Sequence, residues 1–96
     1  MATLHVLSHS PYADRSLESC LRVLGKQDGL LLSGDAVYAL QGSEASNRLT
    51  QVSAALYALD EDVTARNISA AHNAQLVDYT AFVELCCQYD KVNAWL

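Results

Sequence analysis

Three cysteines and one histidine are the residues of this sequence that are best suited to catalysis. Cys20 lies in the segment LESCL, Cys86 and Cys87 are adjacent, and His9 stands in the segment LSHSPY. A thiolate attacks the outer sulfur of a persulfide or carries that sulfur, and its reactivity follows its ionised fraction and its access. An imidazole can act as a general base or stabilise a thiolate. Cys20, as a persulfide carrier, and His9 are therefore the candidate catalytic residues.

Cys20 also fits a structural role. Leu17, Cys20, Leu21 and Leu24 recur at the spacing of one helix face, and a free cysteine on such a face is often a small buried hydrophobe. A position inside the helix also keeps the thiol away from the amides at the helix start, which stabilise thiolates. Both interpretations stay open, whereas Cys86 and Cys87 are expected to be structural.

No cofactor or metal is expected. The odd number of cysteines argues against a closed disulfide framework, and neither a CxxC pair nor a Cys/His set with zinc spacing occurs. The sequence also has no G-x-G-x-x-G or P-loop pattern for a nucleotide. The acidic run of Asp60, Glu61 and Asp62 is similar to a paired-carboxylate site, but a solvated helix start explains it without further assumption.

Length and charge narrow the function classes. The 96 residues suit one domain, 1–96, and 51% of them are hydrophobic, so part of the surface is a candidate interface. The net charge is −5 and the six basic residues are scattered, so no direct nucleic acid binding is expected. The sequence starts without a signal peptide and has no run long enough to span a membrane, so a cytoplasmic protein without membrane contact is expected.

Short apolar runs alternate with amphipathic stretches along the chain. Strands are expected at residues 4–7, 29–32, 52–59 and 75–77, with residues 92–96 as a tail or edge strand. Helices are expected at about 14–24, 43–49, 60–66 and 79–89, whereas residues 35–40 are either a loop or one helical turn. This alternation predicts an α/β fold with a mainly parallel sheet flanked by helices, as in flavodoxin.

The carboxyl ends of the strands should hold the functional crevice. The loops at residues 8–13, 33–36 and 60–62 follow strands and should meet there. The expected helix caps are Asp14, Ser43, Asp60 and Asp78, and the expected helix ends are Gly25 and Asn67.

The last helix has an apolar stripe. Its inward side is expected to carry Tyr79, Phe82, Val83 and Cys86. The aromatic residues Tyr79, Tyr89 and Trp95 are candidate interface anchors or core residues. His5 is expected to be packed within its strand, and His72 lies in a loop with no visible partner.

Four segments resemble the TusB/DsrH family. They are LHVLSHSPY, LLLSGDAVYAL, LYALDEDVTARN and VDYTAFVELCCQYDKVNAWL, which stand in the family's order and spread over the whole chain. The resemblance implies a DsrE/F/H-like fold and a heterohexamer with TusC/DsrF-like and TusD/DsrE-like sister subunits. It implies sulfur relay, either for 2-thiouridine at the tRNA wobble position or in dissimilatory sulfur oxidation. The established persulfide cysteine of such complexes belongs to the TusD/DsrE-like subunit, so this chain is expected to be an accessory subunit of a sulfurtransferase complex.

Two other function classes stay open. One is a stand-alone ligand-binding or regulatory α/β module, which the lack of a phosphate loop weakens. The other is a complete thiol enzyme with Cys20 as nucleophile and His9 as base, although nothing in the sequence brings the two together. Cys20 matches a cysteine of DsrH-branch proteins that some TusB-branch members lack.

Overall fold

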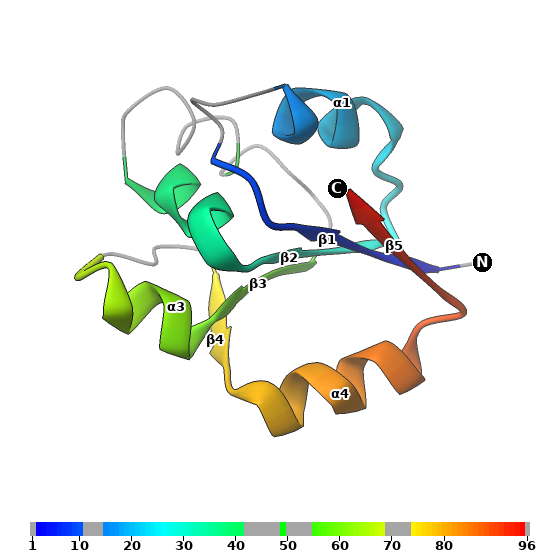
Figure 1. Cartoon of the computed structure of the whole chain (residues 1–96). Helices are drawn as coiled ribbons and strands as arrows, with labels where there is room; N and C mark the ends of the chain where they lie inside the picture. The colour runs from blue at the N-terminus through cyan, green and yellow to red at the C-terminus, as the bar shows by residue number, and fades with distance from the viewer. Residues whose placement is uncertain (1, 11–14, 42–48, 50–54, 69–73, 96) are drawn as a thin grey trace.

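The computed structural model describes residues 2–10, 15–41, 49, 55–68 and 74–95. The elements follow in the order β1 (Thr3–Leu7), α1 (Ser16–Val23), β2 (Gly29–Leu32), the 3-10 helix η1 (Gly34–Leu40), β3 (Ala55–Leu59), α3 (Asp60–Ala65), β4 (Gln75–Val77), α4 (Tyr79–Gln88) and β5 (Lys91–Trp95). The ambiguous residues 35–40 are thus helical, and the last segment is a strand (Figure 1).

The strands form one five-stranded sheet in the order β4-β3-β2-β1-β5. All four strand pairs are parallel, which confirms the expected α/β fold. β2 is buried along its whole length because strands flank it on both sides and helices cover both faces. β5 is an edge strand that pairs with β1, and four of its five residues are exposed.

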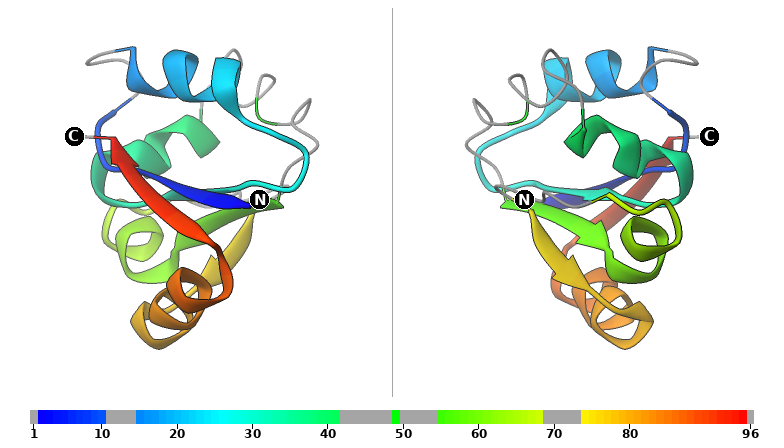
Figure 2. Two further views of the ribbon diagram at one scale, coloured as in Figure 1. Left: turned by 90° about the vertical axis from the view of Figure 1, so that its right-hand side faces the viewer. Right: turned by 90° about the vertical axis from the view of Figure 1, so that its left-hand side faces the viewer.

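Two apolar clusters lie on opposite faces of the sheet. The larger one joins α1, η1 and α3 to the side chains of one face, among them Leu7, Leu30 and Leu32. The smaller one joins α4 to Leu4 and Leu31 on the other face. Figure 2 shows α1 and η1 together on one side of the sheet and α4 on the other.

Several local signals act as the sequence predicts. The carboxylate of Asp78 accepts a hydrogen bond from the amide of Ala81 over 2.8 Å and caps α4. Asn67 follows α3 with φ at 54°, the left-handed conformation that its short polar side chain tolerates. α1 ends before Gly25, whose amide donates to Asp28 over 2.9 Å.

Two predictions about helix details are wrong. Asp60 is the first residue of α3 rather than its cap, because β3 runs directly into the helix and Leu59 takes the cap position with no side-chain hydrogen bond. The inward stripe predicted for α4 is wrong for two of its four residues, whereas Phe82 and Cys86 do pack against the smaller cluster. Leu85 is the buried residue of α4, whereas Tyr79 and Val83 are 54% and 59% exposed. Apolar residues occur on both sides of this helix, so periodicity alone does not fix which side packs.

The predicted caps Asp14 and Ser43, most of the predicted helix at 43–49, and His72 lie outside the described residues. In the part of the chain that the structure describes, no helix is long and apolar enough to cross a membrane.

Candidate functional site

The segments that follow β1, β2 and β3 meet at the carboxyl edge of the sheet. The amide and the hydroxyl of Ser33, which follows β2, both donate to the carbonyl of Leu7 at the end of β1, over 2.9 and 3.0 Å. This confirms, for their described residues, that these segments share one edge.

Gly34 brings the segments after β1 and β2 into close approach. Its φ is +52°, and a Cβ built on it would lie 3.1 Å from the carbonyl oxygen of Ser8. A residue with a side chain would therefore meet both backbone strain and a tight contact. The Gly34 amide donates to the carboxylate of Asp62 on α3 over 2.8 Å, so the turn after β2 is tied to the helix after β3.

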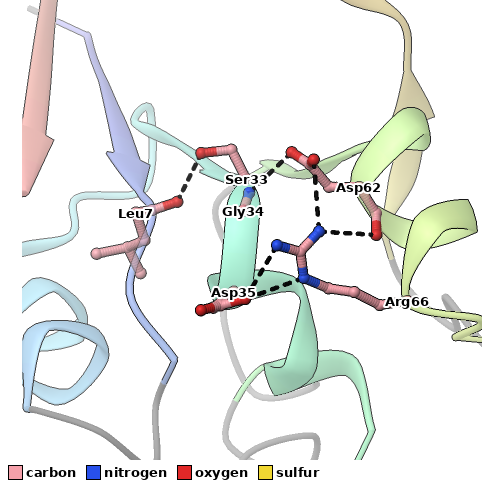
Figure 3. Close-up of polar contacts among 6 residues, drawn as sticks. All are labelled: Leu7, Ser33, Gly34, Asp35, Asp62 and Arg66. Atoms are coloured by element: carbon pink, nitrogen blue, oxygen red, sulfur yellow. Dashed lines mark hydrogen bonds and ion pairs between the residues drawn. The ribbon is translucent and has the colours of Figure 1, made fainter.

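Arg66 bridges the carboxylates of this edge, as Figure 3 shows. Its Nε and Nη2 donate to one oxygen of Asp35 over 3.0 and 2.9 Å, and its Nη1 lies 3.5 Å from Asp62. The guanidinium also lies over the ring of Tyr38, 5.9 Å from its centroid. Through these ion pairs and the hydrogen bond from the Gly34 amide to Asp62, the cluster connects η1 to α3.

The residues of the acidic run at the start of α3 therefore have two different environments. Asp60 and Glu61 are exposed, as a solvated helix start predicts, and Asp62 is only partly exposed and engaged. Sequence reasoning missed Gly34 and Arg66 as its partners. The four-residue spacing of Asp62 and Arg66 was the available signal, since it puts both on one side of a helix.

Cys20 lies in the larger core cluster and its exposed fraction is 0%. Burial raises the pKa of this thiol from 9.0 to about 12, and the negative charge of Asp28 adds to the effect. In this conformation the thiol is protonated at neutral pH and out of contact with solvent. Both properties suit a packed side chain, and a sulfur-carrying thiol would need α1 to move.

His9 lies in the segment after β1 and is exposed. Since Cys20 is completely buried, the structure does not present this thiol and the imidazole of His9 on one accessible surface. The roles proposed for the two residues in catalysis stay predictions.

His5 belongs to a polar cluster that the sequence did not reveal. Its Nδ1 accepts from the indole N–H of Trp95 over 3.1 Å, and its Nε2 lies 3.4 Å from the carboxylate of Asp28. Asp28 also accepts from the amides of Gly25 and Thr3, and these bonds together with His5 hold the pKa of its carboxyl below the usual range. As predicted, His5 is packed within its strand.

The adjacent cysteines of α4 differ in access. Cys86 packs against the smaller cluster, and burial is the main cause that raises its pKa. Cys87 is exposed. Among the described residues, no group of three or more histidines, cysteines and acids is placed to hold a metal ion.

A shallow hollow of about 290 Å³ lies between α4 and the strands β3 and β4. It is lined by Tyr57, Gln75, Val77, Ala81, Glu84, Leu85 and Gln88. Its volume lies just below the range of about 300–1,000 Å³ that is typical of ligand pockets. Beside it, the hydroxyls of Tyr57 and Tyr89 are 3.4 Å apart, and burial is the main cause that raises the pKa of Tyr89 to about 12.

Comparison with known proteins places this chain in a family. The "DsrH like protein" family matches residues 9–92. "Protein TusB" of Yersinia enterocolitica is 37% identical over 95 residues, which cover 96% of this chain and 99% of that protein. "Protein TusB" of Yersinia pestis is 38% identical over 95 residues, which again cover 96% of this chain and 99% of that protein.

A solved structure supports the fold independently. The crystal structure of the ychN protein from E. coli superposes with a TM-score of 0.76 over 99% of this chain and 100% of that chain. At 19% sequence identity this likeness shows the fold alone. The family match and the TusB relatives together establish that this chain belongs to the DsrH-like family.

Proposed function

We propose that this chain is a subunit of a cytoplasmic sulfur-relay complex that serves 2-thiolation of the tRNA wobble uridine. The observation that carries the proposal is the identity of 37% and 38% with two TusB proteins over nearly their full length. The partners in this proposal are a TusC/DsrF-like and a TusD/DsrE-like sister subunit in a heterohexamer. The acidic chain, with a net charge of −5, leaves contact with the tRNA to those partners.

Two measurements test this proposal. The first is native mass spectrometry of a tagged copy purified from its own cell, where two small sister subunits in equal amounts are expected. The second is the 2-thiouridine content of tRNA after deletion of the gene, which should fall and recover on complementation. A chain that purifies alone, from cells whose 2-thiouridine does not depend on it, would contradict the proposal.

Dissimilatory sulfur oxidation is the second candidate process. The observation that favours it is Cys20, since DsrH-branch proteins have a cysteine at this point of the first helix. Unchanged 2-thiouridine together with lost sulfur oxidation in the deletion strain would select this process. The complex would be of the same kind in either case.

Cys20 as a sulfur carrier is a separate proposal. In that step the Cys20 thiolate attacks the outer sulfur of a donor persulfide, forms a new S–S bond and releases the donor thiolate, so that atoms and electrons balance. The buried thiol and its raised pKa require α1 to open first. Unchanged sulfur transfer by the Cys20→Ser variant would rule out this role, and with it the enzyme in which His9 is the base.

Thiol labelling tests the required opening directly. Native protein should react at the exposed Cys87 and leave the buried Cys20 unmodified until it unfolds. Labelling of Cys20 at a rate close to that of Cys87 would show that α1 opens readily and would support a carrier.

The stand-alone ligand-binding module is the alternative from another class. The hollow of about 290 Å³ beneath α4 is its described candidate site. Ligand-dependent thermal shifts of the isolated chain would favour it. Their absence, together with co-purifying sister subunits, would favour the relay subunit.

A further inference from the structure

Among the described elements, α4 is the one helix that covers its face of the sheet, and its outward side is short of charge. Its ten residues, YTAFVELCCQ, contain one ionisable carboxylate, Glu84, and no basic residue. Tyr79 is 54% exposed and Val83 59% exposed, and Cys87 is also exposed. These three residues follow one another at intervals of four, so they form a line along the outside of the helix, which we call the outer stripe.

The opposite side of the molecule has a different surface. On α1 the partly exposed Glu18 and the exposed Arg22 form an ion pair over 3.4 Å. Val23 beside them is 59% exposed, the same fraction as Val83. A single apolar side chain among charges is normal on a protein surface, whereas a helix with apolar residues on both sides is typical of a buried one. The two valines therefore form a matched pair in different surroundings.

β5 carries a further exposed apolar residue. Val92 is 45% exposed and stands in register with Leu4, which belongs to the core cluster under α4. Side chains of residues in register point to the same face of a sheet, so Val92 lies on the same face as α4. Exposed apolar residues that gather on one side of a molecule mark a candidate interaction site.

We propose that the outer stripe of Tyr79, Val83 and Cys87, together with Val92, is the surface on which a sister subunit of the relay complex docks. This inference rests on the proposed function and adds to it the face by which the chain joins the complex. Interface centres are poor in charge and enriched in aromatic residues, and this patch holds no charged residue and includes Tyr79.

The charges around the patch specify the chemistry of the partner. Asp78 precedes α4, Glu84 lies within it and Asp90 follows it, and all three are exposed. In the described segment 74–95, Lys91 is the one basic residue. A partner with an apolar centre and lysine or arginine at its rim complements this arrangement. A second copy of the chain does not, because antiparallel α4 helices crossing at Glu84 would set the carboxylates of both copies against one another. An anionic bilayer repels the same charges.

The test is co-expression of a tagged chain with the two sister subunits, followed by affinity purification and native mass spectrometry. Val83→Asp should lower the recovered sister subunits by about tenfold or more, as expected for an interface centre. Val23→Asp is the control with equal exposure and should recover them in full. Circular dichroism should show that both variants are folded, which their exposed positions allow.

A charge reversal tests the proposed basic rim of the partner separately from the apolar contact, again by the recovery of the sister subunits. Glu84→Lys should weaken recovery, and Glu18→Lys on α1 should not. Full recovery by both Val83→Asp and Glu84→Lys would overturn the inference, as would a loss with Val23→Asp alone.

Two other results separate this inference from the proposed function. A wild-type chain that recovers no sister subunit overturns the proposed function and this inference with it, whereas recovery unaffected by the α4 variants overturns the docking surface alone. A homodimer of the isolated chain that Val83→Asp dissociates would show that a second copy occupies the patch. Binding of the isolated chain to phosphatidylglycerol vesicles that Val83→Asp abolishes would assign the patch to a membrane.

Discussion

The indole N–H of Trp95 donates a hydrogen bond to Nδ1 of His5 over 3.1 Å. An indole nitrogen is a donor only, so Nδ1 is the acceptor of this bond, and the tautomer that fits it carries its proton on Nε2. Nε2 lies 3.4 Å from Oδ2 of Asp28. The bond ties the end of the edge strand β5 to β1 through side chains as well as through the backbone.

Replacing Trp95 with Phe tests this hydrogen bond. Phenylalanine keeps an aromatic ring but leaves Nδ1 of the buried His5 without its donor, at a cost of about 1–3 kcal/mol in the free energy of unfolding. Urea unfolding followed by circular dichroism measures it, because the variant loses the chain's single tryptophan. Adding His5→Leu should cost less than the sum of the single changes. Strict additivity would show that the bond contributes nothing.

Gly34→Ala tests the close approach at the carboxyl edge. The positive φ of Gly34 costs an alanine about 1–2 kcal/mol, and its Cβ would also press on the carbonyl of Ser8. Gly25→Ala is the control, because its Cβ meets only the side chain of Asp28 at 3.4 Å. We expect the thermal midpoint to fall by several degrees for Gly34→Ala and clearly less for Gly25→Ala. Equal shifts would contradict the assignment of strain to Gly34.

The two carboxylates bound by Arg66 should differ in their contribution to stability. Asp62 is 24% exposed and also accepts from the Gly34 amide, so Asp62→Ala should cost about 1.5–3 kcal/mol. Asp35 is 60% exposed, and Asp35→Ala should cost about 0–1 kcal/mol. Urea unfolding of both variants gives the comparison. A larger loss for Asp35→Ala would mean that the ion pair, and not the hydrogen bond to the turn, holds η1 to α3.

Signals that act within a few residues could be predicted from the sequence. Asp78 caps α4 because its carboxylate needs only the amide three residues on, and Asn67 ends α3 because of its own tolerance of positive φ. β2 was predicted within its observed bounds, since a buried central strand is apolar throughout. The alternation of such elements was enough to predict a parallel sheet.

Contacts between distant segments could not be predicted in this way. Arg66 reaches Asp35, and Gly34 reaches Asp62, only after β2 and β3 have paired. The side on which α4 packs could not be predicted for the same reason, because it depends on contacts with distant strands. Both of its sides carry apolar residues, and packing against the sheet selects the side with Leu85. Tyr79 and Val83 of the exposed outer stripe are thus residues that local reasoning assigned to the inward side.

The buried thiol of Cys20 should make the protein lose stability in alkaline solution. Its pKa is about 12 in the folded chain and 9.0 as the ordinary value, so the folded state holds the proton more tightly. The resulting stability is fully present below pH 9.0 and is lost as the pH rises from there through about 12. Cys20→Ala should therefore flatten the fall of the free energy of unfolding across this range.

Urea unfolding under reducing conditions, at about pH 8 and at intervals up to about pH 11, measures the slope directly. Part of the fall should survive in Cys20→Ala, because the pKa of Tyr89 is also raised, from 10.0 to about 12. Cys87→Ala, at an exposed position, is the matched control and should follow the wild type. If wild type and Cys20→Ala lose stability in parallel, the Cys20 thiol is already accessible to solvent in the native ensemble. Sulfur transfer at Cys20 would then not require α1 to open.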